Sequence, residues 1–408
     1  MGSTRVRAKG SARRTSTSPT FVSLFSGCGG LDLGFLGAGY RCLLAIDNDA
    51  EALAVHSGNL ASPVAQLDLV TQRPPDEVLR GVDAFVCGPP CQGFSTIGGR
   101  RPDDPRNSLL VDVAKLASIY MPKLVVIENV PGARSRLHDR YWLEAESLLR
   151  SAGFSTTTIA LDVERLGLAQ TRRRLVMLAW RTGFSGELAL PSSAPKSIAD
   201  VLTGVEQLDD HNPQYLAAGT RHHQISLAIG QGQKLCNVRS SNRCVRTWAI
   251  PEVFGSTSSE EREVLEAIVT LRRRNRARAW GDADPVSVRD VSRFRGRPEG
   301  RTIDRLVRRG FLRRIDKKID IVHTFNGKYR RPHAGGPAPT VDSRFGDYHY
   351  VLHPTEHRGF TIREAARIQS FPDDYRFSGS LKSQLRMIGN AVPPAAALAV
   401  ARLTRELI

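Results

Sequence analysis

The sequence has no long apolar run. Nowhere along its 408 residues do about 18 consecutive apolar residues occur, and a membrane-spanning helix needs a run of roughly that length. The N-terminus is basic and rich in serine and threonine instead of apolar, so no secretory signal is expected. Both absences predict a soluble, cytoplasmic protein.

Cysteine is also scarce. The chain has six cysteines, and none of them forms a Cys-x-x-Cys pair. Disulfide scaffolds and zinc ribbons need more cysteines or closer pairs of them. We therefore expect reduced thiols and no metal site, in a globular chain that is long enough for two or three domains.

Acidic residues are too few to balance the basic ones. The chain has 58 lysines and arginines against 41 acids, a net charge of +17. Residues 262–331 hold 21 basic and 9 acidic residues, and residues 1–20 hold 5 basic residues and no acid. We predict that residues 1–20 form a disordered basic tail and that the internal block binds a polyanion. A merely solvated basic face is the alternative for both segments.

Near the N-terminus the sequence predicts a strand, a glycine turn and a helix. Residues 21–25 are an apolar strand, Ser26-Gly27-Cys28-Gly29-Gly30 follows, and a helix begins at Leu31. Such a turn brings backbone amides close to a ligand at a helix N-terminus. The next strand, residues 40–46, ends at Asp47, about 20 residues beyond the glycines, where an acid can bind a ribose. Because no P-loop lysine follows, the pattern favours a nucleoside without a triphosphate, such as S-adenosylmethionine.

Two later strands also end in residues that can carry chemistry. One strand leads into Gly88-Pro89-Pro90-Cys91, and its two prolines restrict the backbone, so the thiol of Cys91 is presented as a nucleophile would be. A small buried thiol is the alternative. Residues 123–127 form an apolar strand that delivers Glu128, and a carboxylate in that place is a candidate functional group or a surface cap.

A third strand carries the sequence Arg172-Arg173-Arg174. Alternation along a strand puts Arg172 and Arg174 on one face and Arg173 on the other. Both could then point at one anionic or base-like ligand, unless this is a solvated basic edge.

Six motifs in order give the chain its resemblance to the DNA (cytosine-5)-methyltransferases of the bacterial modification type. They are residues 21–35, 88–95, 128–130, 170–175, 363–372 and 384–394. The resemblance implies an α/β fold, with a Rossmann-like S-adenosylmethionine-dependent methyltransferase domain and a smaller target-recognition domain. We expect residues 21–181 plus 384–408 to form the catalytic domain. Residues 182–383 would hold the target-recognition domain and the connecting motifs.

The resemblance implies methyl transfer from S-adenosylmethionine to C5 of a flipped-out cytosine in a specific site of double-stranded DNA. Cys91 would add to C6 of the base, which makes C5 nucleophilic. Glu128 would hydrogen-bond the base and support protonation at N3. Arg174 would hold the O2 side of the ring, and Arg172 would support the Cys91 loop.

The resemblance also assigns the cofactor residues. Phe25 would contact the adenine, Asp47 the ribose hydroxyls and Asp68 the adenine amino group. The full expected set is Phe25, Ser26, Gly27, Gly29, Gly30, Leu31, Asp47, Asn48, Asp68, Leu69, Pro89, Leu109, Asn390 and Ala391. Two departures from the family pattern are Ser23, where many relatives carry an acid, and Leu168-Ala169, where Val-Pro is commoner.

The basic block falls in the variable target-recognition region of this family. Its patterns predict helices at residues 260–276, 285–291 and 302–309 and a hairpin within 311–323. Three helices and a hairpin resemble a winged helix, which places cations in or beside the DNA major groove; an irregular lobe is the alternative. The cations expected to contact DNA are Arg301, Arg305, Arg308, Arg309, Lys317 and Lys318. Residues 324–350 should join the two parts, and a final helix at 392–407 should pack on the N-terminal domain.

Three other functions compete with this prediction. Amino-group methylation of adenine or cytosine needs an aromatic residue after the two prolines, where Cys91 stands. Methylation of C5 in transfer RNA is a closer rival. A DNA-binding regulator on an inactive fold is the third, and the presence of Cys91, Glu128 and Arg174 argues against it. We expect a nucleoid-associated monomer, with a separately acting restriction endonuclease as a candidate partner.

Overall fold

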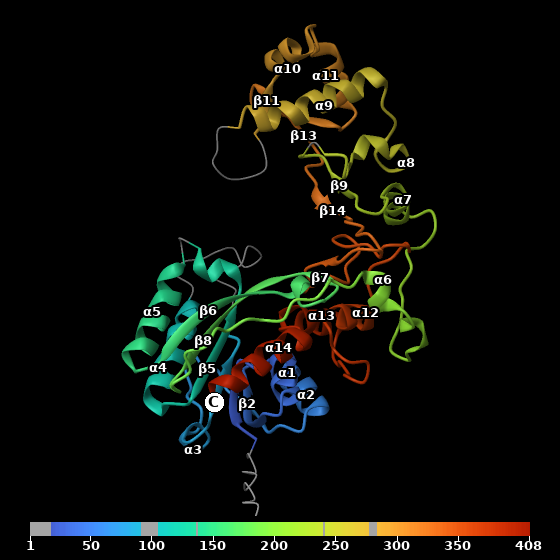
Figure 1. Ribbon diagram of the computed structural model, residues 1–408. Helices are drawn as coiled ribbons and strands as arrows, with labels where there is room; N and C mark the ends of the chain where they lie inside the picture. The colour runs from blue at the N-terminus through green and yellow to red at the C-terminus, as the bar shows by residue number, and fades with distance from the viewer. Residues whose placement is uncertain (1–17, 91–104, 136–137, 240, 277–283) are drawn as a thin grey trace, which may run out of the picture.

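The computed structural model describes residues 18–90, 105–135, 138–239, 241–276 and 284–408. The order of elements confirms an α/β protein (Figure 1), and its largest sheet is mostly parallel. Among these residues, no helix has the length and apolar character needed to span a bilayer.

A seven-stranded sheet organises the first half of the chain. Its strand order is β3-β2-β1-β4-β5-β8-β6, and every neighbouring pair is parallel except those made by β8. Strands such as β4 and β5 are buried along their whole length because helices cover both faces of the sheet. The strands are β1 (Thr20–Leu24), β2 (Arg41–Asp47), β3 (Val64–Gln66), β4 (Ala84–Cys87), β5 (Leu124–Asn129), β6 (Ser155–Asp162) and β8 (Arg173–Trp180).

Two hydrophobic clusters lie on the two faces of this sheet. On one face α4 and α5 pack through residues such as Leu110 and Trp142. On the other face α1 packs through Phe35, together with Val400 of α14. The helices of this part are α1 (Gly30–Gly37), α2 (Ala50–Asn59), α3 (Asp76–Leu79), α4 (Leu109–Tyr120), α5 (Asp139–Ser151) and α14 (Pro394–Thr404).

The helix at the C-terminal end packs on the N-terminal part of the chain, as predicted, and its direct partner there is α1. A Cβ built on Gly34 of α1 would stand 2.4 Å from Cβ of Ala397 in α14, so the two helices approach closely only because residue 34 has no side chain. Through this contact α14 fixes the preceding segment, residues 389–392, beside the glycine turn.

Strands of the second half of the chain form parts of two small sheets. The strands β9 (Lys234–Cys236), β10 (Cys244–Val245) and β14 (Asn326–Lys328) form a three-stranded sheet, and β15 (Ala338–Pro339) pairs with β7 (Gln170–Thr171). The segment 324–350 thus contributes β14 to the first of these sheets and β15 to the second, and so joins the two parts of the chain as predicted. The remaining helices around this region are α6 (Ile198–Leu202), α7 (Arg221–Ala228), α8 (Pro251–Phe254), α12 (Ile362–Ile368) and α13 (Leu381–Asn390).

Residues 259–321 form the predicted arrangement of three helices and a hairpin. Around a shared core with Val264, Ile303 and Ile319, the order is helix, strand, helix, helix and two strands, with an antiparallel sheet in the order β11-β13-β12. This is winged-helix topology, and we call residues 259–321 the winged-helix module. It consists of α9 (Ser259–Arg274), β11 (Val286–Ser287), α10 (Val288–Arg295), α11 (Gly300–Arg308), β12 (Leu312–Ile315) and β13 (Lys318–Ile321).

Several predicted boundaries differ from the structure by a few residues, and two of these differences have a clear structural cause. The helix expected at 285–291 begins at Val288, because Val286 and Ser287 pair with β13 and Ser287 then caps the helix. Thr20, expected in the disordered tail, is the first residue of β1: it pairs with Arg41 and donates its backbone N–H to Asp83. The tail residues 1–17 lie outside the described residues.

Candidate active site

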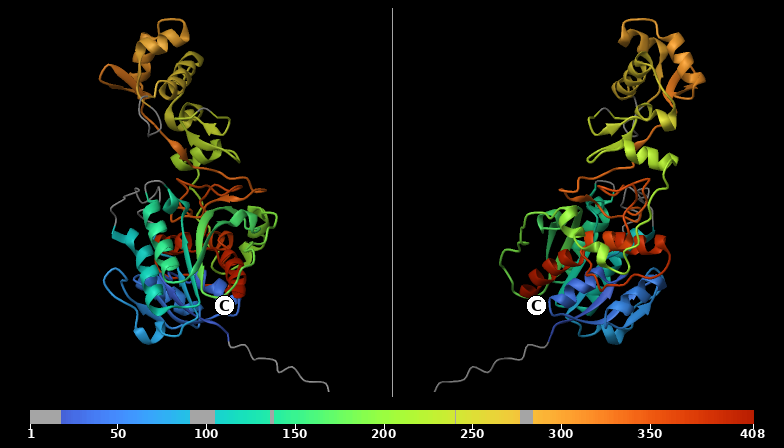
Figure 2. Two further views of the ribbon diagram at one scale, coloured as in Figure 1. Left: turned by 60° about the vertical axis from the view of Figure 1, so that its left-hand side comes forward. Right: turned by 90° about the vertical axis from the view of Figure 1, so that its right-hand side faces the viewer.

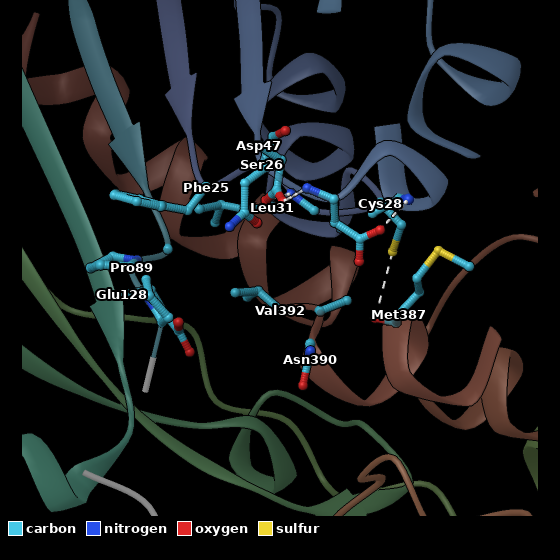
Figure 3. A pocket seen from close by; sticks show the side chains of 18 of the residues that line it. Phe25, Ser26, Cys28, Leu31, Asp47, Pro89, Glu128, Met387, Asn390 and Val392 are labelled. Atoms are coloured by element: carbon cyan, nitrogen blue, oxygen red, sulfur yellow. Dashed lines mark hydrogen bonds between the residues drawn. The ribbon is translucent and has the colours of Figure 1, made fainter. Parts of the chain in front are cut away.

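A cavity of about 310 Å³ opens at the carboxyl ends of β1, β2, β4 and β5. Figure 3 shows Phe25, Ser26 and Asp47 at one wall, Glu128 and Pro89 at another, and Asn390 and Val392 from the C-terminal segment. Open α/β sheets bind ligands beyond these strand ends, since side chains and amides from several strands converge there.

The structure brings nearly the whole expected cofactor set to this cavity. The lining includes Phe25, Ser26, Gly27, Gly30, Leu31, Asp47, Asn48, Asp68, Leu69, Pro89, Leu109, Asn390 and Ala391. Gly29 alone of that set is not in the lining. Its φ is +88°, and a Cβ there would stand 2.7 Å from Leu60 and 2.9 Å from His56, so Gly29 serves the turn and its packing.

Asp47 is held in a fixed orientation at the end of β2. Its Oδ2 accepts the backbone N–H of Gly27 at 2.8 Å, and its Oδ1 accepts that of Asp49 at 2.9 Å. Burial raises the pKa of Asp47, and these backbone hydrogen bonds partly offset the effect. Each carboxylate oxygen still has a free lone pair for a hydroxyl donor.

The lining fits a nucleoside that carries an amino acid. Ser26 Oγ is buried at this wall and has no hydrogen-bond partner among the residues that the structure describes, so a ligand can satisfy it. Gly27 has nothing within 4 Å of the position that a Cβ would take, so there is open space beside its Cα. The carboxylates of Asp47 and Asp68 also line the cavity, where each can accept hydrogen bonds from hydroxyl or amino groups.

Further lining residues were not predicted from the sequence. Arg386 of α13 lines the cavity and pairs with Asp49, the N-cap of α2, and more loosely with Glu51 at 3.4 Å. Arg386 and Asn390 are four residues apart on one helix and so share a face; that spacing is the signal that could have found Arg386. The other unpredicted lining residues include Cys28, Ala52, Leu67, Val70, Arg106, Val130, Met387 and Val392.

Glu128 and Arg174 face each other at the far end of the same cavity. Arg174 Nε of β8 lies 2.9 Å from Glu128 Oε1 of β5, and both residues line the cavity. Burial raises the pKa of Glu128 above its usual range, although the charges of Arg174 and Arg172 lower it in part. A carboxyl group with a raised pKa holds a proton more readily at neutral pH, and it can then donate a hydrogen bond to a ligand.

Arg172 does not join Arg174 at the cavity. Its buried guanidinium donates to three backbone carbonyls: Val341 at 2.8 Å, Gly389 at 3.1 Å and Ala391 at 2.9 Å. The expected convergence of the two arginines on one ligand is therefore wrong in this structure. Strand pairing changes partners at Arg172, since β7 pairs with β15 and β8 with β5, so simple alternation does not run through this residue.

Cys91, the expected nucleophile, lies outside the described residues. The residues that lead to it are described: Gly88, Pro89 and Pro90 all line the cavity. Asn129, directly after Glu128, donates from Nδ2 to the carbonyl of Pro89 at 3.2 Å. The start of the Cys91 segment is thus fastened to the strand end that carries Glu128.

The departure at Ser23 has a structural counterpart away from the cavity. Ser23 Oγ donates to Asp32 at 2.6 Å, and Asp32 lies 2.8 Å from Nε2 of His56, with all three residues buried. Asp32 of α1 is thus the acid of a buried hydrogen-bond network that joins Ser23 of β1 to His56 of α2.

The cations expected to contact DNA divide into two groups. Arg305 pairs with Glu261 at 2.9 Å, and Arg309 pairs with the same carboxylate at 2.7 Å, so their charge is largely balanced within the module. Their side chains remain 44% and 36% exposed, so contact of Arg305 and Arg309 with DNA stays a prediction. In contrast, Arg301, Arg308, Lys317 and Lys318 are exposed and make no ion pair within the described ranges. The described part of the chain holds no cluster of side chains able to bind a metal ion.

Comparison with known proteins agrees with this geometry. The family model of C-5 cytosine-specific DNA methylases matches residues 19–405. The chain is 30% identical to the Type II methyltransferase M.DdeI of Desulfomicrobium norvegicum over 93% of this chain and 87% of that protein. It is 29% identical to M.AgeI of Thalassovita gelatinovora over 95% and 99%. The solved structure of the Entamoeba histolytica methyltransferase EhMeth, 15% identical over 96% of this chain and 99% of that one, shares the fold with a TM-score of 0.55. The chain belongs to the C-5 cytosine-specific DNA methylase family and is a DNA methyltransferase.

Proposed function

We propose that this enzyme methylates C5 of a cytosine flipped out of a specific duplex site, through a covalent bond between Cys91 and C6. The observation that supports this most is the position of Glu128. Its buried carboxyl group, with a raised pKa, faces the same cavity as the nucleoside-binding residues, beside the Pro89-Pro90 segment that leads to Cys91.

The proposed reaction begins with the Cys91 thiolate. Its sulfur forms a bond to C6, and the electron pair of the C5–C6 double bond moves onto the ring. Glu128 in its protonated form donates to N3, which removes negative charge from the base as the adduct forms. Arg174 keeps a positive charge beside the Glu128 carboxyl group and the bound base. C5 then takes the methyl group, and loss of the C5 proton to a base releases the Cys91 thiolate and restores the double bond.

S-adenosylmethionine, when bound, supplies an electrophilic methyl group on a sulfonium sulfur. The residues that would hold it are Asp47 at the ribose, Phe25 at the adenine and Ser26 beside Gly27 at the amino-acid end. We propose Arg172 as a positioning residue, because its three hydrogen bonds fix the segment that carries Asn390 and Ala391 to the cavity wall.

The proposal extends to context and organisation. Because the relatives named above are Type II methyltransferases, we propose a modification enzyme of a restriction-modification system. We also propose the division made from the sequence, with residues 21–181 plus 384–408 catalytic and the intervening residues selecting the target. A base that is stacked in duplex DNA cannot reach a cavity at the ends of the β-strands, so the cytosine must flip out of the DNA duplex.

Sequencing of bisulfite-treated DNA from cells that express the chain tests this function. We expect protected cytosines within one short sequence motif, and no protection with the Cys91→Ser variant. Purified protein offered duplex DNA and transfer RNA with labelled methyl donor separates the two substrates. Label in transfer RNA alone would overturn the DNA assignment.

A further inference from the structure

A second cavity, of about 250 Å³, lies next to the first one. It has α4 on one side and residues 69–74, which follow β3, on the other, with Leu24 and Phe25 at the end of β1 between them. The left view of Figure 2 shows α4 in the teal pair of helices, on the face of the sheet away from α14 in red. Among the described residues, none from the C-terminal segment 386–392 lines this second cavity.

The two cavities have part of their walls in common. Four residues line both of them: Phe25, Leu69, Val70 and Leu109. All of these except Val70 belong to the cofactor set predicted from the sequence, whereas Glu128 lines the first cavity alone. The second cavity therefore begins beside the nucleoside end of the first cavity, away from the groups proposed to act on the base.

The inner walls of the second cavity are apolar. On α4 its lining residues recur at intervals of three or four positions and so present one face of the helix: Leu109, Val113, Leu116 and Ile119. Ile119 is 63% exposed, and Val70 on the facing segment is 51% exposed. Apolar side chains that are exposed on both walls of one cavity favour an apolar occupant, because contact with it removes their surface from water.

The open side of the second cavity is polar. Arg73 and Lys115 are exposed there, and Lys115 pairs with Asp112 at 2.9 Å. These long side chains can keep their charged ends in water while their stems line the cavity. A suitable occupant is therefore a small apolar group that enters from the first cavity and ends at this polar rim.

The turn between the two cavities has a fixed conformation. Asp68 Oδ1 accepts the backbone N–H of Val70 at 3.0 Å, and Gln72 Oε1 accepts that of Asp68 at 2.7 Å. The backbone N–H groups of Thr71 and Gln72 donate to the carbonyl of Asp68 at 3.0 and 2.8 Å. This turn holds Asp68 at the first cavity, and it holds Leu69 and Val70 at the boundary between the two.

An amino group that carries one substituent suits this boundary. With the adenine beside Phe25, as proposed above, Asp68 can accept one N–H of the adenine amino group. The amino group has two hydrogens, so a substituent that replaces the other one leaves this hydrogen bond possible. Such a substituent would begin next to Leu69 and Val70. An apolar cavity of about 150 Å³ can hold benzene, so the second cavity, at about 250 Å³, is large enough for a phenyl ring.

We propose that the second cavity is a subsite for an apolar substituent on the adenine amino group. The enzyme then binds N6-substituted adenosine derivatives in addition to S-adenosylmethionine, whose unsubstituted amino group does not reach the subsite. The subsite has Leu69 and Val70 on one wall and Val113, Leu116 and Ile119 on the other. This inference rests on the proposed function for the position of the adenine.

Calorimetric titration of the full-length protein with S-adenosylhomocysteine and with its N6-benzyl derivative tests this subsite. We expect wild type to bind the benzyl derivative no more than about threefold more weakly than the parent compound. Leu116→Trp puts an indole ring into the subsite, so it should weaken binding of the derivative at least about tenfold and change binding of the parent little. The matched control Leu143→Trp alters an exposed leucine of α5 that lines neither cavity, and it should change neither affinity.

A second variant keeps the test decisive if the larger side chain disturbs folding. Ile119→Asp, at an exposed position of α4, replaces part of the apolar wall with a carboxylate and should weaken binding of the benzyl derivative alone. Retained affinity for S-adenosylhomocysteine shows that a variant is folded. A selective loss of the benzyl derivative in either variant supports the subsite.

Two results would overturn the proposal. One is a benzyl derivative that binds wild type more than about threefold more weakly than the parent compound. The other is the absence of a selective loss in both Leu116→Trp and Ile119→Asp, because the substituent would then lie elsewhere. If wild type binds the parent compound and rejects the derivative, this inference fails and the proposed cofactor site stands. If wild type binds neither compound, the proposed cofactor site fails and the subsite fails with it.

Discussion

Replacement of Arg172 by lysine separates a positioning role from a direct role in chemistry. The guanidinium of Arg172 reaches three carbonyls on two segments, at Val341, Gly389 and Ala391. A lysine has one ammonium group on a flexible stem and cannot span all three in the same plane. At least two of these hydrogen bonds should be lost.

The magnitude follows from the burial of the group. A hydrogen bond from a charged donor contributes about 1.5–3 kcal/mol, so the loss of two should reduce the free energy of unfolding by about 3–6 kcal/mol. Gly389 and Ala391 line the cavity, so their displacement should also weaken cofactor binding. A loss of about 1.4 kcal/mol in binding free energy corresponds to a tenfold weaker Kd for S-adenosylmethionine.

Chemical denaturation and calorimetric titration of S-adenosylmethionine measure the two effects. The neighbouring variant Arg173→Lys is the matched control, because Arg173 is exposed and makes a single surface pair with Asp162 at 3.3 Å; it should change stability by less than about 1 kcal/mol. If Arg172→Lys kept the wild-type stability and cofactor affinity but lost kcat, the positioning role would be refuted.

Three further substitutions test other parts of the structure. Gly34→Ala should lower the free energy of unfolding by about 1–3 kcal/mol, because its Cβ would meet Ala397 at 2.4 Å. The control Gly37→Ala, whose Cβ would lie 3.4 Å from its nearest neighbour, should be neutral or stabilising in the same denaturation experiment. Equal effects of the two substitutions would contradict the close contact between the helices. Asp47→Asn should weaken S-adenosylmethionine binding at least about tenfold in a calorimetric titration, since a charged acceptor contributes about 1.5–3 kcal/mol; unchanged affinity would remove Asp47 from the site. The raised pKa of Glu128 means that its proton stabilises the folded protein below the ordinary pKa of 4.5, and that this stabilisation is lost as the pH rises through the raised value. Denaturation of Glu128→Gln at pH 5 and pH 8 should therefore show the variant gaining stability relative to wild type at the higher pH, and a difference independent of pH would count against the shift.

The catalytic-side fold was predictable because its strands have strong local signals. Strands buried on both faces are largely apolar runs, as in β4 and β5; Gly88 follows β4, and β5 carries Glu128 at its end. Asp47 and Glu128 could be placed at the same edge of the sheet because parallel strands all end there. The winged-helix module was predictable for a similar reason, since its helices and hairpin have clear periodicity.

The contacts that could not be predicted join distant segments. Arg305 and Glu261 are 44 residues apart, and nothing in the local pattern shows that α9 and α11 bring them together. The role of Arg172 depends on a change of strand partner between β7 and β8, which periodicity does not encode. The elements α6, α7, β9 and β10 are short and lack a regular apolar pattern, so tertiary packing decides their structure.

The central claim is a bond between Cys91 and C6 of a cytosine beside the Glu128 carboxyl. A DNA library in which 5-fluorocytosine replaces cytosine tests it directly, because fluorine at C5 cannot leave as a proton does and the protein–DNA bond persists after methyl transfer. We predict a complex that survives denaturation, requires S-adenosylmethionine, maps to Cys91 by mass spectrometry of its peptides, and is absent with Cys91→Ser. An enzyme that methylates unmodified DNA but forms no such complex, or one attached at another residue, would contradict the account.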